Sequence, residues 1–356
     1  MALPDTMAGV QLTGHRDLDK LVWNEAIPLP RPGPGEALVK IAAAGVNNTD
    51  INTRVGWYAR EDAEEEGGGW SGALSFPLIQ GADVCGEVVA FASDGGADGG
   101  DIGGDIALGM RVTCATNQPD PTPGAPYGVR VIGSEFDGAF AQYCRVPIRH
   151  LYDVSASPLT DIEIAALPCA HGTAYNLVSR ATVGADDRVL VTDASSGVGM
   201  AAVELAKLRG AHVTGLASAA KHDAVRRASV DAVLDRSATP PAGGFTVVID
   251  LVGGPGWTGF IEALVPGGRY GIVGAMVAAD LRTIYLNDLT MFGCTHTPGE
   301  VFAELVALIN GGRINPLVSK TYDLADIATA QTEFAAKTHP GKLVLIPPAA
   351  SRTAKK

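Results

Sequence analysis

A turn of small residues, between a predicted strand and a predicted helix, is the clearest chemical signal in this sequence. Residues 189–192 are apolar or β-branched, which predicts a buried strand, and a helix with one apolar face follows the turn and ends at Gly210. The turn consists of Ala194, Ser195, Ser196, Gly197, Val198 and Gly199. Its backbone N–H groups and the positive end of the helix dipole would converge on one point, which suits a pyrophosphate. The pattern therefore predicts a dinucleotide cofactor and redox chemistry.

The turn departs from the usual G-x-G-x-x-G fingerprint, since Ala194 and Ser196 replace its first two glycines. The alternative is an ordinary turn of a parallel sheet that binds nothing. The complete strand–turn–helix–strand unit of about 30 residues favours the cofactor site.

The residues after the second predicted strand of this unit indicate which dinucleotide is bound. A site for NAD places Asp or Glu about 20 residues past the glycines, where it binds the ribose 2′-OH. Here no acidic residue lies between Leu205 and His222, and Ser218 and Lys221 could instead bind a 2′-phosphate. The sequence therefore predicts NADPH. The alternative for these residues is a solvated basic helix face.

Two further turns are expected to line the nicotinamide half of the cofactor. Ligands of a parallel sheet bind beyond the carboxyl ends of its strands. The turns that follow the strands predicted near Asp250 and Tyr270 contain Leu251, Val252 and Gly253, and Ile272, Val273 and Gly274.

The secondary structure expected to position these residues differs between the first and the second part of the chain. The first 150 residues favour short strands, at 37–42, 84–91, 111–115 and 141–146, which indicates a compact β or barrel-like domain. From residue 161 onward helices and strands alternate, which predicts a doubly wound parallel sheet. The predicted helices are 161–167, 173–180 and 301–309, and the predicted strands include 189–192, 212–216, 232–234, 247–251, 270–273 and 342–346. The predicted fold class is therefore α/β, with a β domain that precedes the parallel sheet in the sequence.

Composition excludes several classes of partner. The net charge of −12 and the pI of about 5.0 would repel nucleic acid and anionic membranes. Neither a membrane span nor a signal peptide is expected, and five scattered cysteines favour reduced thiols in the cytoplasm. The acidic segment 61–69 and the Gly/Asp-rich segment 93–104 are interpreted as solvated insertions.

Five segments, in order along nearly the whole chain, resemble the medium-chain dehydrogenase/reductases. They are residues 7–14, 45–52, 81–86, 168–175 and 341–345. The resemblance implies a GroES-like substrate domain at 1–155, a Rossmann NADPH-binding domain at 156–295, and a return to the first domain at 296–356. It also implies a homodimer, to which the apolar segment 290–294 could contribute an edge strand.

The resemblance raises the question of whether the N-terminal domain binds a catalytic zinc ion. In the zinc-dependent members a Cys stands at the position of Asn47 and a His at the position of Ala82, and neither residue here can replace them as a ligand. Asp83 and Cys169 remain, but they do not complete a site of three protein ligands, and the lobe with four clustered cysteines is missing. The chain is therefore similar to the zinc-independent, quinone-oxidoreductase-like branch.

Further site residues follow from the same resemblance. It implies that Thr173 and Asn47 lie near the nicotinamide ring, with Asn47 as a catalytic residue. It also implies that Lys342, in the closing motif, binds the cofactor. Tyr58 matches the proposed proton donor of mitochondrial-type enoyl thioester reductases, and a stacking or core tyrosine is its alternative. For Asn47 the alternative is a capping or turn residue, and His171 is either a proton relay or a structural helix histidine. The substrate pocket is expected to be formed by Trp57, Tyr58, residues 61–69, Phe136 and Tyr127.

The function expected from these features is NADPH-dependent reduction of quinones or of α,β-unsaturated carbonyl compounds without metal. Three alternatives stay open: an enoyl thioester reductase, an alcohol dehydrogenase-like enzyme, and an NADPH-binding protein with little turnover.

Overall fold

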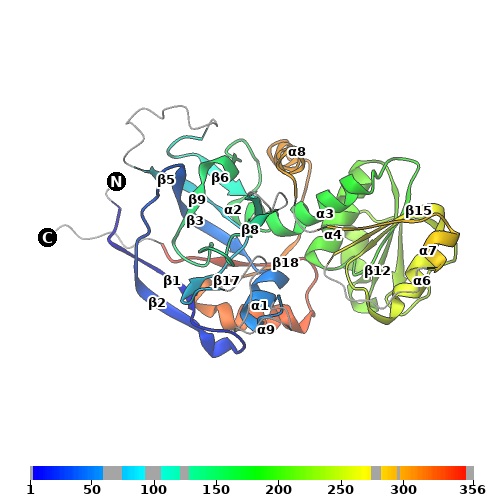
Figure 1. Ribbon diagram of the computed structural model, residues 1–356, viewed down its shortest axis with the longest axis horizontal. Helices are drawn as coiled ribbons and strands as arrows, with labels where there is room; N and C mark the ends of the chain where they lie inside the picture. The colour runs from blue at the N-terminus through cyan, green and yellow to red at the C-terminus, as the bar shows by residue number, and fades with distance from the viewer. Residues whose placement is uncertain are drawn as a thin grey trace. The chain divides into compact units, whose positions relative to one another are not determined.

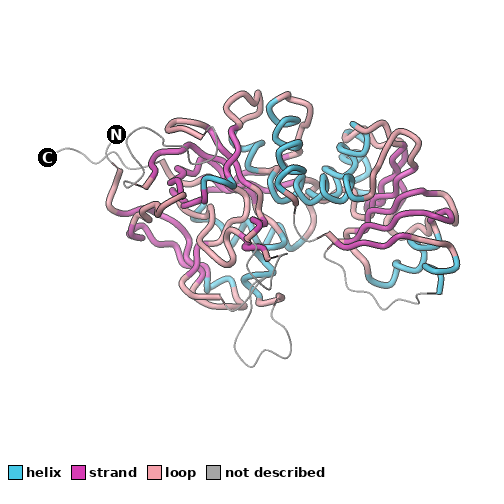
Figure 2. The backbone as a smooth tube through the Cα atoms, turned by 45° about the horizontal axis from the view of Figure 1, so that its top comes forward, coloured by secondary structure: helices cyan, strands magenta, loops and turns pink. Residues whose placement is uncertain are grey.

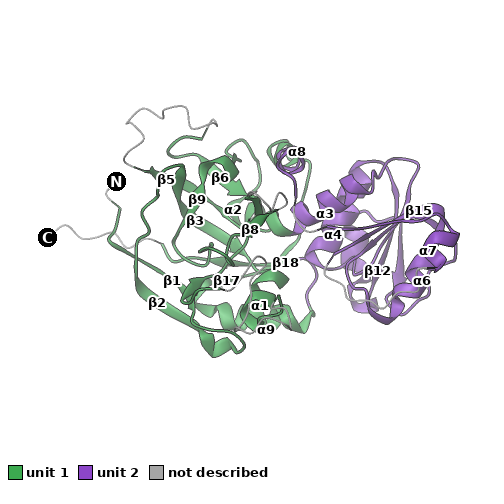
Figure 3. Cartoon of the chain, in the orientation of Figure 1, with its two compact units in different colours: residues 1–169, 306–338, 342–356 green, residues 170–305, 339–341 purple. Residues whose placement is uncertain are grey.

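The computed structural model of the 356-residue chain describes residues 3–58, 74–92, 106–120, 128–273, 282–294 and 297–349. The chain divides into two compact units, which Figure 3 shows in different colours. Unit 1 comprises residues 1–169, 306–338 and 342–356, and unit 2 comprises residues 170–305 and 339–341. The insertions predicted at 61–69 and 93–104 lie outside the described residues.

Unit 2 contains a six-stranded sheet in which every neighbouring pair of strands is parallel (Figure 1). Its strands are β11 (Arg188–Val191), β12 (His212–Ala217), β13 (Ala232–Asp235), β14 (Phe245–Asp250), β15 (Leu264–Ile272) and β16 (Thr290–Gly293). Their spatial order is β13-β12-β11-β14-β15-β16, so the order reverses between β11 and β14. This is the dinucleotide-binding order with a topological switch point, and it confirms the predicted Rossmann sheet.

The helices of this part of the chain lie on both sides of that sheet (Figure 2). They are α3 (Pro168–Arg180), α4 (Gly197–Leu208), α5 (His222–Arg227), α6 (Trp257–Glu262) and α7 (Arg282–Leu286). A further helix, α8 (Gly299–Asn310), spans the boundary between the two units. In α4 three residues of the predicted apolar stripe, Ala202, Leu205 and Ala206, are buried, whereas the fourth, Leu208, is 38% exposed. The chain leaves α4 through Gly210, whose φ of 86° suits only glycine without strain.

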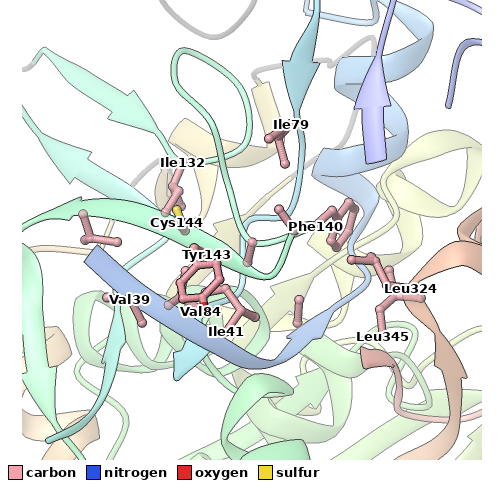
Figure 4. Close-up of a cluster of buried hydrophobic side chains, with 14 of the residues drawn as sticks. Val39, Ile41, Ile79, Val84, Ile132, Phe140, Tyr143, Cys144, Leu324 and Leu345 are labelled. Atoms are coloured by element: carbon pink, nitrogen blue, oxygen red, sulfur yellow. The ribbon is translucent and has the colours of Figure 1, made fainter. Parts of the chain in front are cut away.

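Unit 1 is built from antiparallel sheets around the long strand β3 (Glu36–Gly45). That strand pairs with β5, β9 and β18, and β18 in turn pairs in parallel with β17. The other strands are β1 (Thr6–Leu12), β2 (Leu21–Pro28), β4 (Leu78–Ile79), β5 (Cys85–Phe91), β6 (Arg111–Cys114), β7 (Asn117–Pro119), β8 (Val129–Val131), β9 (Tyr143–Pro147), β10 (Leu151–Asp153), β17 (Val318–Asp323) and β18 (Lys342–Ile346). Figure 4 shows the buried core between them, to which Val39, Ile41 and Phe140 contribute. The predicted GroES-like β domain is confirmed.

The helices of unit 1 are α1 (Asn48–Val55), α2 (Asp161–Ala165) and α9 (Ile327–Ala336). Short 3-10 helices in the two units are Leu18–Lys20, Ile148–His150, Ala219–Lys221, Gly254–Gly256 and Leu324–Asp326. No helix among the described residues is long and apolar enough to cross a membrane.

Two predicted elements begin at least five residues earlier in the structure than expected. β15 begins at Leu264, six residues before the predicted 270, because Pro266, Gly267 and Gly268 are read as a turn although the strand continues through them with a shift in register. The helix predicted at 173–180 begins at Pro168, since proline fits the first turn of a helix.

Candidate functional site

The turn before α4 has the geometry of a phosphate-binding site. Ser196 precedes the helix with extended dihedral angles, and its Oγ accepts a hydrogen bond from the Gly199 N–H at 3.1 Å. Within the described part of the chain, no acceptor lies opposite the N–H groups of Gly197 and Val198. These two donors and the helix dipole are what an anion needs at a helix N-terminus.

Close packing holds this turn against the sheet. A Cβ atom at Gly199 would lie 2.1 Å from the Asp193 carbonyl oxygen and 2.8 Å from the Ala194 Cα. On the other side, the Gly341 N–H donates to the Ser195 carbonyl oxygen at 2.9 Å. The residues present therefore fit a dinucleotide pyrophosphate, with glycine required only where helix and strand touch.

Two basic residues lie at the ends of β12 and β13. Ser218 precedes the short 3-10 helix after β12, and Lys221 is the last residue of that helix. After β13, the Arg236 N–H donates to the Ala217 carbonyl oxygen at 2.9 Å. Burial lowers the pKa of Lys221, as does the nearby positive charge of Arg236, whereas Asp193 raises it. Arg236 was not predicted from the sequence. Its position directly after β13, which pairs in parallel with β12, could have indicated that it lies near Lys221.

One buried carboxylate shapes the turn 251–253 that was predicted to line the nicotinamide. Asp250, at 0% exposure, accepts hydrogen bonds from Thr192 Oγ1 at 2.7 Å, from the N–H groups of Val252 and Gly253 at 3.0 and 3.1 Å, and from Tyr270 Oη at 2.5 Å. These donors come from the carboxyl ends of β11 and β14 and from β15. Asp250 thus holds the turn 251–253 in place through hydrogen bonds to its backbone. This role was not predicted from the sequence.

The remaining predicted cofactor residues occupy nearby elements of the same unit. Thr173 is half-buried on α3, and the Val273 N–H donates to the Asp250 carbonyl oxygen at 3.2 Å. Leu251 and Ile272 are half-buried at the ends of β14 and β15, and Gly274 lies outside the described residues. His171, at 3% exposure, lies with Nε2 3.2 Å from Glu204 Oε2 of α4, which agrees with the structural alternative for this histidine.

A second cluster lies in unit 1, around the ammonium group of Lys342. Its Nζ donates to the Val46 carbonyl oxygen at 2.9 Å, to Asp83 Oδ2 at 3.0 Å and to Asn47 Oδ1. Asn47 Nδ2 donates to the same Asp83 Oδ2 at 2.9 Å, and the Cys169 N–H donates to Asp83 Oδ1 at 2.7 Å. Asp83 is fully buried and Lys342 is 4% exposed. We call Lys342, Asn47 and Asp83 the ammonium network.

Two titratable side chains border the ammonium network. Burial raises the pKa of Asp50 to about 7, and the negative charge of Asp83 raises it further, whereas the Asn47 N–H lowers it. Burial also raises the pKa of the Cys169 thiol to about 12, with Asp83 as the next cause. With these neighbours alone, Cys169 is therefore a neutral thiol at neutral pH.

Tyr58 follows α1 and is held against its first turn. Its Oη donates to Thr49 Oγ1 at 3.2 Å, and its ring lies edge-on to the half-exposed Trp57 at 5.2 Å between centroids. Burial raises the pKa of Tyr58 above its ordinary value, so the phenol keeps its proton at neutral pH. Thr49 was not predicted as its partner.

Unit 1 also has a cavity of about 180 Å³, lined by residues that include Met7, Ile27, Phe136 and Arg130. Phe136 was predicted as a wall of the substrate pocket, but neither the ammonium network nor Tyr58 lines this cavity. Tyr127, the other predicted wall, lies outside the described residues. We therefore base the site on the contacts above and not on this cavity.

Two family models match the sequence. The alcohol dehydrogenase GroES-like domain matches residues 33–156, and the zinc-binding dehydrogenase model matches residues 214–345.

Whole-length similarity extends to solved structures and curated proteins. The structure of a "putative alcohol dehydrogenase" from Sinorhizobium meliloti 1021 is 37% identical, with a TM-score of 0.87, over 97% of this chain and 98% of that chain. An NAD-dependent alcohol dehydrogenase of Sulfurisphaera tokodaii is 26% identical over 93% of this chain and 98% of its own length. An acryloyl-coenzyme A reductase of Metallosphaera sedula is 27% identical over 95% of this chain and 99% of its own length.

Sheet order, turn geometry, family models and whole-length relatives agree. The chain belongs to the medium-chain dehydrogenase/reductase superfamily and is an NAD(P)H-dependent oxidoreductase.

Proposed function

We propose that this enzyme reduces α,β-unsaturated carbonyl compounds or quinones with NADPH and without a metal. The observation that carries the proposal is the ammonium of Lys342, which is bonded to Asn47 and Asp83. Asn47 stands where the zinc-dependent members have their first ligand, so a cation of the chain itself lies where a metal would need a thiolate.

The residues at the family's metal positions do not fit zinc. A catalytic zinc needs three protein ligands, and no group of three or more His, Cys, Asp or Glu side chains suited to a metal occurs among the described residues. Asn47 and Ala82 stand at the positions of the Cys and His ligands, and neither side chain can replace them. We expect full activity after dialysis against a chelator and less than about 0.1 metal per chain by elemental analysis. Loss of activity that zinc restores would instead favour the alcohol dehydrogenase-like alternative.

Residues of unit 2 fit the cofactor. The turn 194–199 would hold the pyrophosphate, and Ser218, Lys221 and Arg236 offer a hydroxyl and two cations for a 2′-phosphate. Bound NADPH supplies a hydride to an electron-poor carbon of the substrate.

The preference for NADPH is tested by kinetics with both cofactors, since one relative is named NAD-dependent. We expect Lys221→Ala to raise KM for NADPH about tenfold and to leave KM for NADH unchanged, because only NADPH carries the phosphate. A wild-type enzyme that prefers NADH would overturn the assignment.

The second half of the reaction is delivery of a proton, and Tyr58 is the candidate donor. Reduction of a conjugated C=C bond places the hydride on one carbon and needs a proton at the other. Tyr58 Oη is protonated at neutral pH, is oriented by Thr49, and would regain its proton from water. Because burial makes it a weak acid, its contribution should be about tenfold to a hundredfold.

Tyr58→Phe is the direct test of this role. It should lower kcat on an enone by more than about tenfold and leave NADPH binding intact, because the ring is kept and only the hydroxyl is lost. Reduction of a quinone, whose product takes protons from solvent, serves as the internal control and should change little. An unchanged kcat on the enone would remove Tyr58 from the mechanism.

A substrate panel decides the reaction class. Oxidation of NADPH is followed with cyclic enones, linear enals, quinones and simple ketones. Turnover of enones or quinones with none of simple ketones is the expected result. No turnover of any of them, with NADPH bound, would favour the NADPH-binding protein with little turnover.

An enoyl thioester reductase is the second candidate. It is favoured by the similarity to an acryloyl-coenzyme A reductase, whose substrate name denotes a conjugated thioester. The net charge of −12 counts against coenzyme A, whose phosphates prefer basic entrances. The ratio of kcat/KM for acryloyl-coenzyme A to that for a small enone separates the two.

The enzyme is further proposed to be a cytoplasmic homodimer. β16 is the last strand of the six-stranded sheet as described, and nearby Tyr285 and Leu286 are 72% and 68% exposed. All five cysteines are unpaired, which suits a reducing compartment. Light scattering after gel filtration tests the dimer, and a monomer would overturn it.

A further inference from the structure

The ammonium group of Lys342 has as many acceptors as it has protons. Its three N–H bonds are directed at the carbonyl oxygen of Val46, at Asn47 Oδ1 and at Asp83 Oδ2. The side chain of Lys342 is 5% exposed and that of Asp83 is 0% exposed. To bind a phosphate of the cofactor, the ammonium would have to give up one of these bonds, although the closing-motif resemblance implies that role.

Two hydrogen bonds, one to Lys342 and one to Asp83, determine the orientation of the Asn47 carboxamide. Its oxygen faces the ammonium of Lys342 and its NH₂ group faces the carboxylate of Asp83. A flipped amide would bring oxygen against oxygen and nitrogen against nitrogen, so the two charges allow a single orientation.

The oriented Asn47 is linked through helix α1 to Tyr58, the proposed proton donor. Asn47 is the residue immediately before α1, and its backbone N–H bonds Asp50 Oδ2 at 2.8 Å. Thr49, in the first turn of the same helix, accepts the hydrogen bond of Tyr58. The start of α1 is therefore connected by direct contacts to the ammonium on one side and to the phenol on the other.

We propose that Lys342 is a positioning residue and that its ammonium acts as a tethered cation. It neutralises buried Asp83, sets Asn47 and the first turn of α1, and through them orients Tyr58. The activity readout of this inference rests on the proposed function. The site itself recognises a primary ammonium group by three oxygen acceptors.

Chemical rescue tests the tethered cation directly. Lys342→Ala removes three methylenes and the ammonium, which are the atoms of n-propylammonium. We expect kcat on an enone to fall more than about tenfold, KM for NADPH to change less than about twofold, and Tm to fall. Added n-propylammonium should restore both kcat and Tm. Tetramethylammonium at equal ionic strength should restore neither, because it has no N–H donor.

Several outcomes would overturn the inference. If Lys342→Ala raises KM for NADPH at unchanged kcat, Lys342 is a cofactor ligand. If tetramethylammonium rescues as well as n-propylammonium, the effect is one of general ionic strength. A variant that keeps wild-type kcat and Tm would exclude any positioning role.

A paired variant covers the case in which Lys342→Ala does not fold. Asp83→Asn combined with Lys342→Met removes both charges, and it should have a higher Tm than either single variant. A double variant no more stable than Lys342→Met alone would contradict the pairing. If the wild-type enzyme reduces no enone or quinone, the proposed function fails, whereas the Tm rescue by n-propylammonium still tests the tethered cation.

Discussion

The two candidate sites, one in each unit, present different chemical groups. In unit 2 the turn before α4 offers backbone N–H groups, and its side chains are small. In unit 1 the ammonium network is made of side chains, two of them charged and all of them buried. Binding by backbone N–H groups depends on the conformation of the chain, whereas binding by side chains depends on which residues are present.

This difference explains which positions can vary. Ala194 and Ser196 stand where glycines are usual, and the turn still presents its N–H groups, because those donors do not depend on residue type. Removal of any one member of the ammonium network leaves a buried partner without its hydrogen bond or its counter-charge. The comparison predicts that a change in the turn affects cofactor binding and that a change in the network affects turnover.

The largest effect is expected for Gly199→Ala, which tests the backbone site. Its new Cβ would lie 2.1 Å from the Asp193 carbonyl oxygen, so the turn must move. We expect NADPH binding to weaken about a hundredfold, measured by titration of cofactor fluorescence. Gly184→Ala is the matched control, because nothing lies within 4 Å of its new Cβ. Equal affinities for the two variants would show that the turn does not hold the cofactor.

Gly45→Ala tests the side-chain site. A Cβ there would lie 2.3 Å from Asp83 Oδ2 and 2.5 Å from the Ala165 carbonyl oxygen, so Asp83 must leave its position. We expect kcat to fall about tenfold with KM for NADPH within about twofold of wild type, measured by steady-state kinetics.

The control for Gly45→Ala is Gly14→Ala in the same unit, whose new Cβ has Lys20 Cδ as its nearest contact at 3.9 Å. If Gly45→Ala weakened NADPH binding as strongly as Gly199→Ala does, the proposed division between the two regions would be wrong.

A smaller effect, on stability, is expected from the pH dependence of Asp50. Burial raises the pKa of Asp50 from 3.8 to about 7, so the folded protein binds this proton more tightly than the unfolded chain does. The free energy of unfolding therefore falls as pH rises between these two values, by at most about 4 kcal/mol. Lys342 and the N–H groups of Asn47 and Ala82 limit the effect, whereas Asp83 increases it.

Asp50→Asn removes this titration and keeps an acceptor for the Asn47 N–H. Its Tm relative to wild type should rise from about pH 4 to about pH 8, where the wild type holds a buried carboxylate. A Tm difference that is constant over this range would contradict the assignment.

The unit 2 half of the molecule could be predicted from the sequence because its signals are local. The strand 189–192, the turn 194–199 and the helix that ends before Gly210 lie within about 20 consecutive residues, and the pattern of β11, β12 and β14 follows from short apolar segments. The role of Asp250 was missed because its side-chain partners, Thr192 and Tyr270, are 58 and 20 residues away in the sequence. Arg236 was missed because only the pairing of β12 with β13 brings it near Lys221.

The unit 1 half could be predicted only in outline. Asn47, Asp83 and Lys342 were singled out separately, but the contact between Lys342 and Asn47 spans 295 residues, and no local pattern reports it. α1 was missed because its sequence, NTDINTRV, has no apolar stripe for a helical period to reveal. Contacts between polar side chains that are distant in the sequence depend on how the strands pair, and local sequence patterns do not determine that pairing.

The tethered ammonium also has a consequence for how such a site can change over generations. If Cys and His were introduced at positions 47 and 82 while Lys342 remained, the buried ammonium would repel the incoming dication. If Lys342 were lost first, Asp83 would be left as a buried charge without a counter-ion. On this electrostatic argument, a metal site would be gained at this place most readily by coupled substitutions of the ligand positions and of Lys342.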